Sequence, residues 1–135
     1  LISVLARQAW HLNLAPGTLA VLRYLGIAFE IAGGAVLLMS YGSMAAARTT
    51  IDPSEHSSKV VTSGLYAYSR NPIYLGWFLL VAGIGFRNAS LLVLVIAVTM
   101  VLLLYRAVIV EEEAYLEKKF GDEYLRYKKS VTRWL

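Results

Sequence analysis

The chain has 135 residues, of which 58% are hydrophobic and 16% charged, and its formal net charge is +4 at pH 7. This apolar excess lies outside the usual balance of soluble proteins and indicates an integral membrane protein of one domain. The lack of cysteine excludes disulfides, thiolate metal sites and a cysteine nucleophile, and no metal site is predicted. The positive charge suits an anionic membrane surface and gives no reason to invoke nucleic acid.

The first predicted membrane helix runs from Leu19 to Met39. Its length suits a hydrocarbon core of about 30 Å at a rise of about 1.5 Å per residue. The helix carries Arg23 and Glu30 on nearly the same face. Glu30 either faces the interior of the bundle or pairs with Arg23, and the pairing is favoured. Close contact with another helix is permitted by three small residues, Gly26, Gly33 and Gly34.

Further along the chain, polar and apolar segments alternate. Residues 41–62 are small, polar and charged, which predicts a loop or a surface helix outside the hydrocarbon. The apolar run 73–86 reaches only roughly 21 Å as a helix, so it needs the preceding residues to complete a crossing. A tight hairpin at 83–90 and a third span at 89–105 follow, and that helix continues unbroken into the acidic residues 111–113.

Gly121 is expected to end the long third helix. The tail beyond it is basic and aromatic, and either folds back over a site, lies on the membrane surface or forms a solvated helix. Taken together, these elements predict an all-α membrane bundle with about three spans, a helix hairpin and a C-terminal helical segment.

Basic residues are concentrated at one end of this predicted bundle. By the positive-inside rule, that end faces the cytoplasm. The chain is therefore expected to be a multi-pass membrane protein with residues 64–76 and the tail together on the cytoplasmic side. The basic residues at this end are Arg48, Lys59, Arg70, Lys118, Lys119, Arg126, Lys128, Lys129 and Arg133.

The segment from Gly64 to Gly76 is polar, aromatic and turn-rich, although apolar segments surround it. Pro72 suits the first turn of a helix, and Asn71 before it is biased toward an extended conformation. From these residues alone, the segment is equally a ligand-binding loop or an interfacial aromatic belt.

Two polar clusters are predicted to face each other across the hairpin. Aromatic rings suit a flat base or a cation, carboxylates suit an amine or a ribose, and arginine suits a carboxylate. No glycine-rich dinucleotide loop and no Ser/His/Asp arrangement is present. The acidic run is equally well explained as a solvated helix start. The clusters are Tyr66, Tyr68, Arg70, Asn71 and Tyr74 on one side, and Arg106 with Glu111, Glu112 and Glu113 on the other.

Residues 61–76 (VTSGLYAYSRNPIYLG) and 112–134 (EEAYLEKKFGDEYLRYKKSVTRW) resemble the two signatures of the isoprenylcysteine carboxyl methyltransferase family. The resemblance implies a single membrane methyltransferase domain over residues 1–135. Residues 1–47 would supply N-terminal membrane helices and residues 48–135 the catalytic portion. S-Adenosylmethionine is the implied methyl donor, and a lipid-like or prenylated molecule is the implied acceptor.

Site residues follow from the same resemblance. Glu112 is implied near the acceptor and the reacting methyl group. Arg106, from the second polar cluster, is predicted as the other catalytic residue. The implied cofactor-binding residues are Ser58, Lys59, Val60, Val61, Tyr66, Asn71, Pro72, Ile73 and Tyr74.

Three positions depart from the family pattern. Ser58 and Asn71 stand where the family often has histidine, and Val108 stands where it has an arginine thought to hold the substrate carboxylate. The Arg-Asn-Pro sequence at 70–72 resembles prokaryotic members and phospholipid N-methyltransferases. The alternatives are therefore a phospholipid N-methyltransferase, an NADPH-dependent reductase of the sterol-reductase type, and a non-enzymatic membrane subunit. The sequence does not define the oligomeric state.

Overall fold

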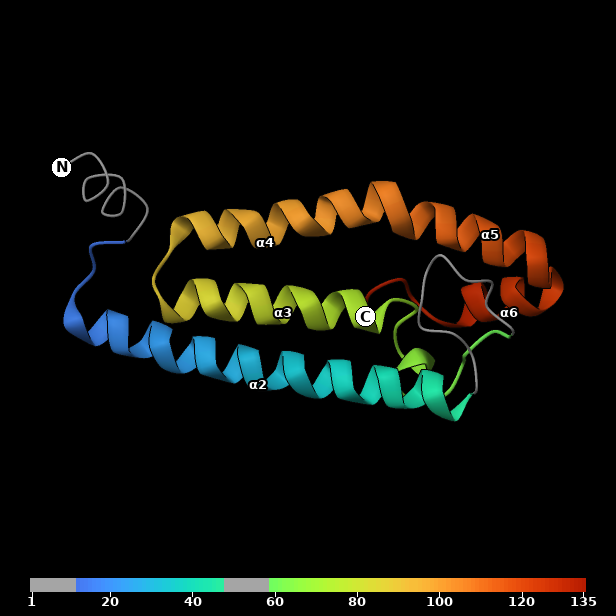
Figure 1. The fold of residues 1–135 in the computed structure, drawn as a ribbon, viewed down its shortest axis with the longest axis horizontal. Helices are drawn as coiled ribbons and strands as arrows, with labels where there is room; N and C mark the ends of the chain where they lie inside the picture. Colours follow the sequence, from blue (N-terminus) through green and yellow to red (C-terminus); the bar gives the residue numbers. More distant parts are fainter. Residues whose placement is uncertain (1–11, 48–58) are drawn as a thin grey trace.

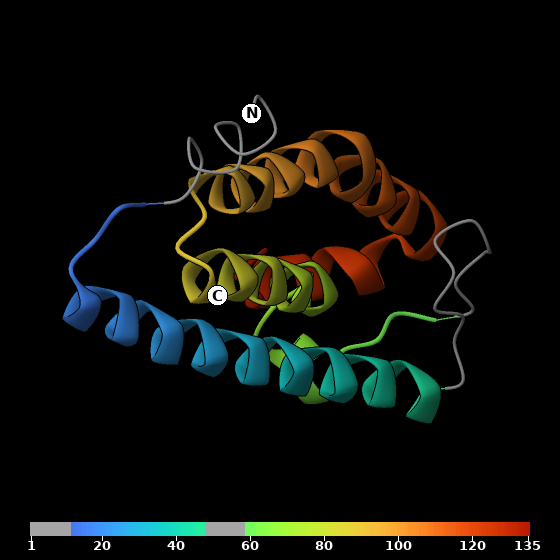
Figure 2. The ribbon, with the colours of Figure 1, turned by 60° about the vertical axis from the view of Figure 1, so that its left-hand side comes forward.

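The computed structural model describes residues 12–47 and 59–135, which form helices joined by short connections. Helix α2 (Pro16–Ala46) runs antiparallel to α3 (Pro72–Arg87), and α4 (Leu91–Leu104) returns on the other side of α3 (Figure 1). A π-helical turn, η2 (Tyr105–Ile109), joins α4 to α5 (Val110–Phe120). Helix α6 (Asp122–Ser130) then folds back toward the start of α3 (Figure 2). The predicted all-α fold is confirmed for the described residues.

Two helices are long and apolar enough to cross a membrane: α2 and the continuous helix over residues 91–120. Helix α3 is apolar but has only 16 residues. These two apolar helices fit the predicted membrane protein. The count of three spans, the cytoplasmic orientation and the division of one domain at residue 47 stay predictions.

Helix α2 extends beyond the predicted bounds at both ends. Pro16 occupies its first turn, where the fixed φ of proline suits a helix. At the other end, Ser40 Oγ donates to the carbonyl of Val36 at 2.6 Å and Ser43 Oγ to that of Met39 at 2.8 Å. Because both hydroxyls donate to carbonyl groups of the same helix, these small polar residues do not end it. Residues 48–58 of the predicted loop lie outside the described residues.

The hairpin between α3 and α4 is tighter than predicted, because α3 remains helical through Arg87. Ala89 has a φ of 46°, in the left-handed region. Ser90 then caps α4 by accepting a hydrogen bond from the amide of Val93 at 3.5 Å. The turn therefore needs only residues 88–90.

Glycines allow α2 and α3 to approach closely. A Cβ atom placed on Gly33 would lie 2.8 Å from the carbonyl oxygen of Gly76, and one on Gly83 would lie 2.8 Å from that of Gly26. A Cβ on Gly34 would meet nothing within 4 Å. Gly26 and Gly33 thus form the predicted close contact, whereas Gly34 does not.

Exchanging Gly33 for alanine is expected to lower the free energy of unfolding by about 1 to 3 kcal/mol, because the new methyl group presses on the backbone of α3. The same exchange at Gly34 is the matched control. It carries the same helix-propensity gain, about 0.5 to 1 kcal/mol, without the clash. Thermal unfolding in detergent measures both. Equal melting temperatures for the two variants would contradict this packing.

Glu30 pairs across the helix interface rather than along its own helix. Its Oε1 lies 3.0 Å from Nε of Arg87 on α3, so the favoured pairing with Arg23 is wrong. The long side chain of Arg87 at the end of α3 reaches Glu30 where Gly83 leaves room: a Cβ on Gly83 would lie 2.8 Å from Cγ of Glu30.

Candidate functional site

The polar segment that follows the undescribed residues 48–58 approaches α3 through a short 3-10 turn, η1 (Gly64–Ala67). Gly64 has a φ of 62°, a conformation that glycine adopts at little cost. Asn71 is extended with a φ of −131°, and Pro72 takes the first helical position of α3. The predicted helix start at Pro72 is confirmed, and it places Tyr74 on the first turn of α3.

Tyr74 links α3 to the acidic run on α5. Its hydroxyl donates to Oε2 of Glu112 at 3.1 Å. Both side chains are half-buried, so the carboxylate is partly withdrawn from solvent and is oriented by the phenol. The two predicted polar clusters do meet in the structure.

The C-terminal residues pack back onto the η1 segment. Tyr127 Oη donates to the carbonyl of Tyr66 at 2.7 Å in a buried contact. The amide of Arg70 donates to the carbonyl of Thr132 at 3.0 Å. Nδ2 of Asn71 donates to the carbonyl of Arg133 at 3.2 Å. Of the three predicted arrangements of the tail, the structure has the one that folds back.

A buried carboxylate fixes this tail. Glu113 receives two hydrogen bonds from Arg133, from Nε to Oε1 at 2.9 Å and from Nη2 to Oε2 at 2.8 Å. Nη1 of Arg70 lies 3.2 Å from Oε2 of the same carboxylate, with side chains of Arg70 and Glu113 only 9% and 7% exposed. Arg133 also donates to the hydroxyl of Tyr105 at 3.1 Å. We call Glu113, Arg133 and Arg70 the carboxylate clasp.

Buried tyrosines surround the clasp. Tyr124 is 1% exposed, and its ring lies 6.1 Å from that of Tyr127 between centroids. Burial raises the pKa of Tyr66, Tyr124 and Tyr127 above the usual range of a phenol. These phenols therefore remain neutral at physiological pH, and Tyr127 donates its hydroxyl proton to the carbonyl of Tyr66.

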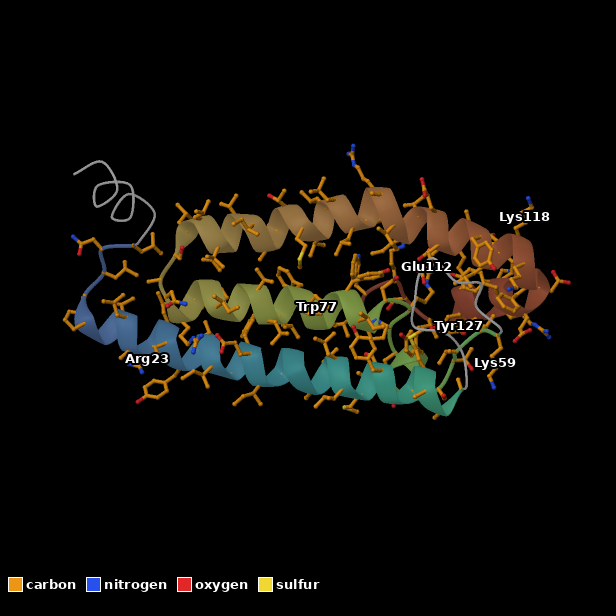
Figure 3. All side chains as sticks on the ribbon, viewed as in Figure 1. Arg23, Lys59, Trp77, Glu112, Lys118 and Tyr127 are labelled. Carbon is orange, nitrogen blue, oxygen red and sulfur yellow. The ribbon has the colours of Figure 1, made fainter. Side chains whose placement is uncertain are left out.

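The predicted site residues occupy different positions around this centre. Tyr66, Asn71 and Pro72 are buried, and Ile73, Tyr74 and Glu112 are half-buried. Figure 3 places Lys59, Tyr127 and Glu112 at the same end of the bundle. Lys59 is exposed, Val60 and Val61 are half-buried, and Ser58 lies outside the described residues.

Arg106 stands apart from this group. It is exposed on η2 and takes part in none of the contacts described above, while Val108 on the same turn is half-buried. A π-helical turn accommodates one extra residue and so shifts the faces of the helix that follows it. A continuous α-helical pattern does not reveal this shift.

Arg70 and Glu113 belonged to the two predicted polar clusters but were not among the predicted site residues. Five further residues at this centre were in neither prediction: Ser69, Tyr105, Tyr124, Tyr127 and Arg133. The available signal was the pair of adjacent glutamates, because two acids in succession on a helix point in different directions. Glu112 meets Tyr74, and Glu113 meets the two arginines.

The residues present suit S-adenosylmethionine by their chemistry. Tyrosine rings accommodate a sulfonium cation. In addition, Nε of Arg70 is buried and lacks a hydrogen-bond partner among the described residues. A buried guanidinium donor with spare capacity is compatible with the carboxylate end of such a ligand.

The chain has relatives with named activities. A mouse (Mus musculus) protein-S-isoprenylcysteine O-methyltransferase is 40% identical over 76 residues, which is 56% of this chain and 27% of the relative. The Schizosaccharomyces pombe protein of the same name is 35% identical over 72 residues, 53% of this chain and 30% of the relative. An uncharacterized protein of Haemophilus influenzae is 70% identical over 27 residues, 20% of this chain and 43% of the relative.

These matches cover less than a third of either named methyltransferase. A family model described as phospholipid methyltransferase, however, matches residues 21–123, most of the chain. That range includes α3, α4 and α5 with Tyr74 and Glu112. The chain therefore belongs to the phospholipid methyltransferase family and is similar to isoprenylcysteine O-methyltransferases.

Proposed function

We propose that this protein is an S-adenosylmethionine-dependent membrane methyltransferase that resembles isoprenylcysteine carboxyl O-methyltransferase and acts on a lipid-like or prenylated acceptor. The observation that carries the proposal is the hydrogen bond from Tyr74 to Glu112. This bond joins the two segments that hold the resemblance, and the two bonded residues are 38 positions apart in the sequence. Family membership supports the reaction class.

S-Adenosylmethionine, when bound, supplies a methyl group on a positively charged sulfur, which an acceptor takes by in-line displacement. The task of the protein in such a reaction is to position both partners and to keep water out. Tyr66, Asn71 and Tyr74 are the proposed positioning groups on the donor side. Glu112 is the proposed group at the acceptor side.

In this proposal, the folded-back tail keeps water out of the site. Its backbone carbonyls at 132 and 133 are held by the amide of Arg70 and the side chain of Asn71. Tyr124 and Tyr127 fill the space beneath it and are almost fully buried. A lipid-tailed acceptor would reach this end of the bundle from the bilayer, with the site on the cytoplasmic face.

A second candidate is a phospholipid N-methyltransferase, and two observations favour it. The matching family model is described as phospholipid methyltransferase. Moreover, Val108 stands where the family resemblance implies an arginine for the substrate carboxylate, and Arg106 nearby is exposed. A carboxylate acceptor needs no base, whereas an amine must lose a proton, and Glu112 is the proposed base.

Asn71→Ala is expected to weaken binding of S-adenosylmethionine by about tenfold, equivalent to about 1.4 kcal/mol. The reason is that the buried amide is lost from the donor side and the carbonyl of Arg133 loses one of its two donors, the other being the hydroxyl of Ser69. Equilibrium dialysis of the full chain in detergent, with labelled S-adenosylmethionine and with NADPH, measures the affinity. Tyr68→Ala, at a residue 73% exposed, is the control.

If the wild-type protein bound NADPH and not S-adenosylmethionine, the proposed function would change from methyltransferase to reductase. Binding of neither would favour a non-enzymatic subunit. Transfer of a labelled methyl group into a prenyl-cysteine mimic or into a phosphatidylethanolamine vesicle then identifies the acceptor class.

A further inference from the structure

A groove lies at the end of the bundle opposite Glu112. Its volume is about 670 Å³, and it lies between the first turns of α2 and the connection from α3 to α4. Figure 3 places Arg23 near this end and Glu112 near the other. The groove is lined by Pro16, Leu19, Ala20, Arg23, Tyr24, Ile27, Arg87, Asn88 and Ala89.

Two arginines from different elements line this groove. Arg23 belongs to α2 and is exposed, and Arg87 ends α3 with its side chain 45% exposed. The only acidic residue in α2, α3 and α4 is Glu30, and it pairs with Arg87. Two positive charges and one negative charge therefore leave a net positive charge around the groove.

The pairing of Glu30 leaves capacity on Arg87. Nε lies 3.0 Å from Oε1 of Glu30, but that oxygen is buried and has no aligned hydrogen bond from any described residue. The two terminal nitrogens of a guanidinium form a fork suited to phosphate oxygens. Arg87 can therefore hold Glu30 by charge and still present donors to a second anion.

The remaining lining has the amphipathic character of a lipid interface. Leu19, Ala20 and Ile27 supply an apolar wall along α2, and Tyr24 is a residue type typical of the headgroup level. Guanidinium groups match the geometry of phosphate oxygens, so two arginines beside an apolar wall suit an anionic phospholipid headgroup. The groove also lies at the beginning of α2, the end of a membrane-length helix.

We propose that this groove binds an anionic phospholipid of the leaflet opposite the candidate methyltransferase site. Arg23 and Arg87 hold the phosphate, and the acyl chains lie along the apolar wall of α2. The lipid acts as a structural ligand that joins α2 to the hairpin. This assignment is independent of the proposed catalytic function.

Native mass spectrometry of the full chain, released from detergent and titrated with phosphatidylglycerol or phosphatidylcholine, tests the proposal. Wild-type protein should bind the first phosphatidylglycerol more tightly than phosphatidylcholine. Arg23→Gln should weaken that binding by about tenfold, as expected for loss of one charge-assisted contact. Lys118→Gln removes the same charge from an exposed residue at the other end and should have no effect.

Arg23→Lys should restore most of the affinity if charge dominates and part of it if the planar fork is required; recovery of either size supports the site. Equal loss in Arg23→Gln and Lys118→Gln would overturn it, because the effect would then be one of net charge. Equal affinity for the two lipids would also overturn it. Displacement of phosphatidylglycerol by inorganic phosphate at equal concentration would reassign the groove to a free anion.

Discussion

Glu113→Gln is expected to lower the free energy of unfolding by about 3 to 5 kcal/mol, the largest stability effect predicted for a single exchange in this chain. Glutamine has the same shape but leaves Arg70 buried, 9% exposed, without a compensating charge. It also breaks the two-point contact with Arg133. Thermal or chemical unfolding in detergent measures the change.

The same exchange should release the tail before the bundle unfolds. The carbonyls of Thr132 and Arg133 accept hydrogen bonds from the backbone amide of Arg70 and the side chain of Asn71, and the carboxylate clasp keeps these groups in register. Hydrogen exchange at residues 124–135 should therefore rise strongly in Glu113→Gln, with weaker binding of S-adenosylmethionine if the tail covers that ligand.

Glu111→Gln is the matched control for this prediction. It makes the same chemical change two residues away, on the same helix, at an exposed position. Surface exchanges of this kind usually change stability by less than about 0.5 kcal/mol. If Glu113→Gln and Glu111→Gln had the same melting temperature, the carboxylate clasp would not hold the tail.

Local chemistry was sufficient to predict the start of the candidate site. Proline fixes its own φ and restricts the residue before it, so Asn71 and Pro72 define a helix start without reference to the rest of the chain. Charge asymmetry along the sequence also predicted that the segment from Gly64 to Gly76 and the acidic run lie at one end of the bundle. The contact from Tyr74 to Glu112 agrees with that placement.

Long-range contacts were not predictable in this way. The carboxylate clasp depends on Arg133, which contacts a glutamate 20 residues earlier in the chain. The tail is also held through backbone carbonyl groups, which every residue possesses. No side-chain pattern encodes which carbonyl a tail will present. The π-helical turn at η2 was hidden for a related reason, because one extra residue in a helix leaves the apolar run unchanged.

The length of α2 shows a different limit. Ser40 and Ser43 mark a polar segment by composition, yet each hydroxyl bonds to the carbonyl four residues before it. Whether a serine ends a helix or stays within it depends on that choice of partner. Composition alone does not decide the matter.

Glu112→Gln is expected to lower the turnover number by about 100-fold with an amine acceptor, the range for loss of a positioned base. Its carboxylate accepts a hydrogen bond from Tyr74, which is retained in part by the amide oxygen of glutamine. Affinity for S-adenosylmethionine should change less than threefold, since the proposed donor-side groups lie on the η1 segment and α3. Single-turnover kinetics with labelled methyl donor separates binding from transfer.

The pH dependence of this defect distinguishes the two acceptor classes. An amine acceptor loses its proton in solution as pH rises toward its own pKa, about 10 for an alkylamine. The deficit of Glu112→Gln should then shrink between neutral pH and pH about 9.5, because the base becomes dispensable. A carboxylate acceptor is already ionised at neutral pH, so any deficit should stay constant over that range. Unchanged turnover of Glu112→Gln with both acceptors at neutral pH would remove this carboxylate from the site and leave the Tyr74 contact a structural one.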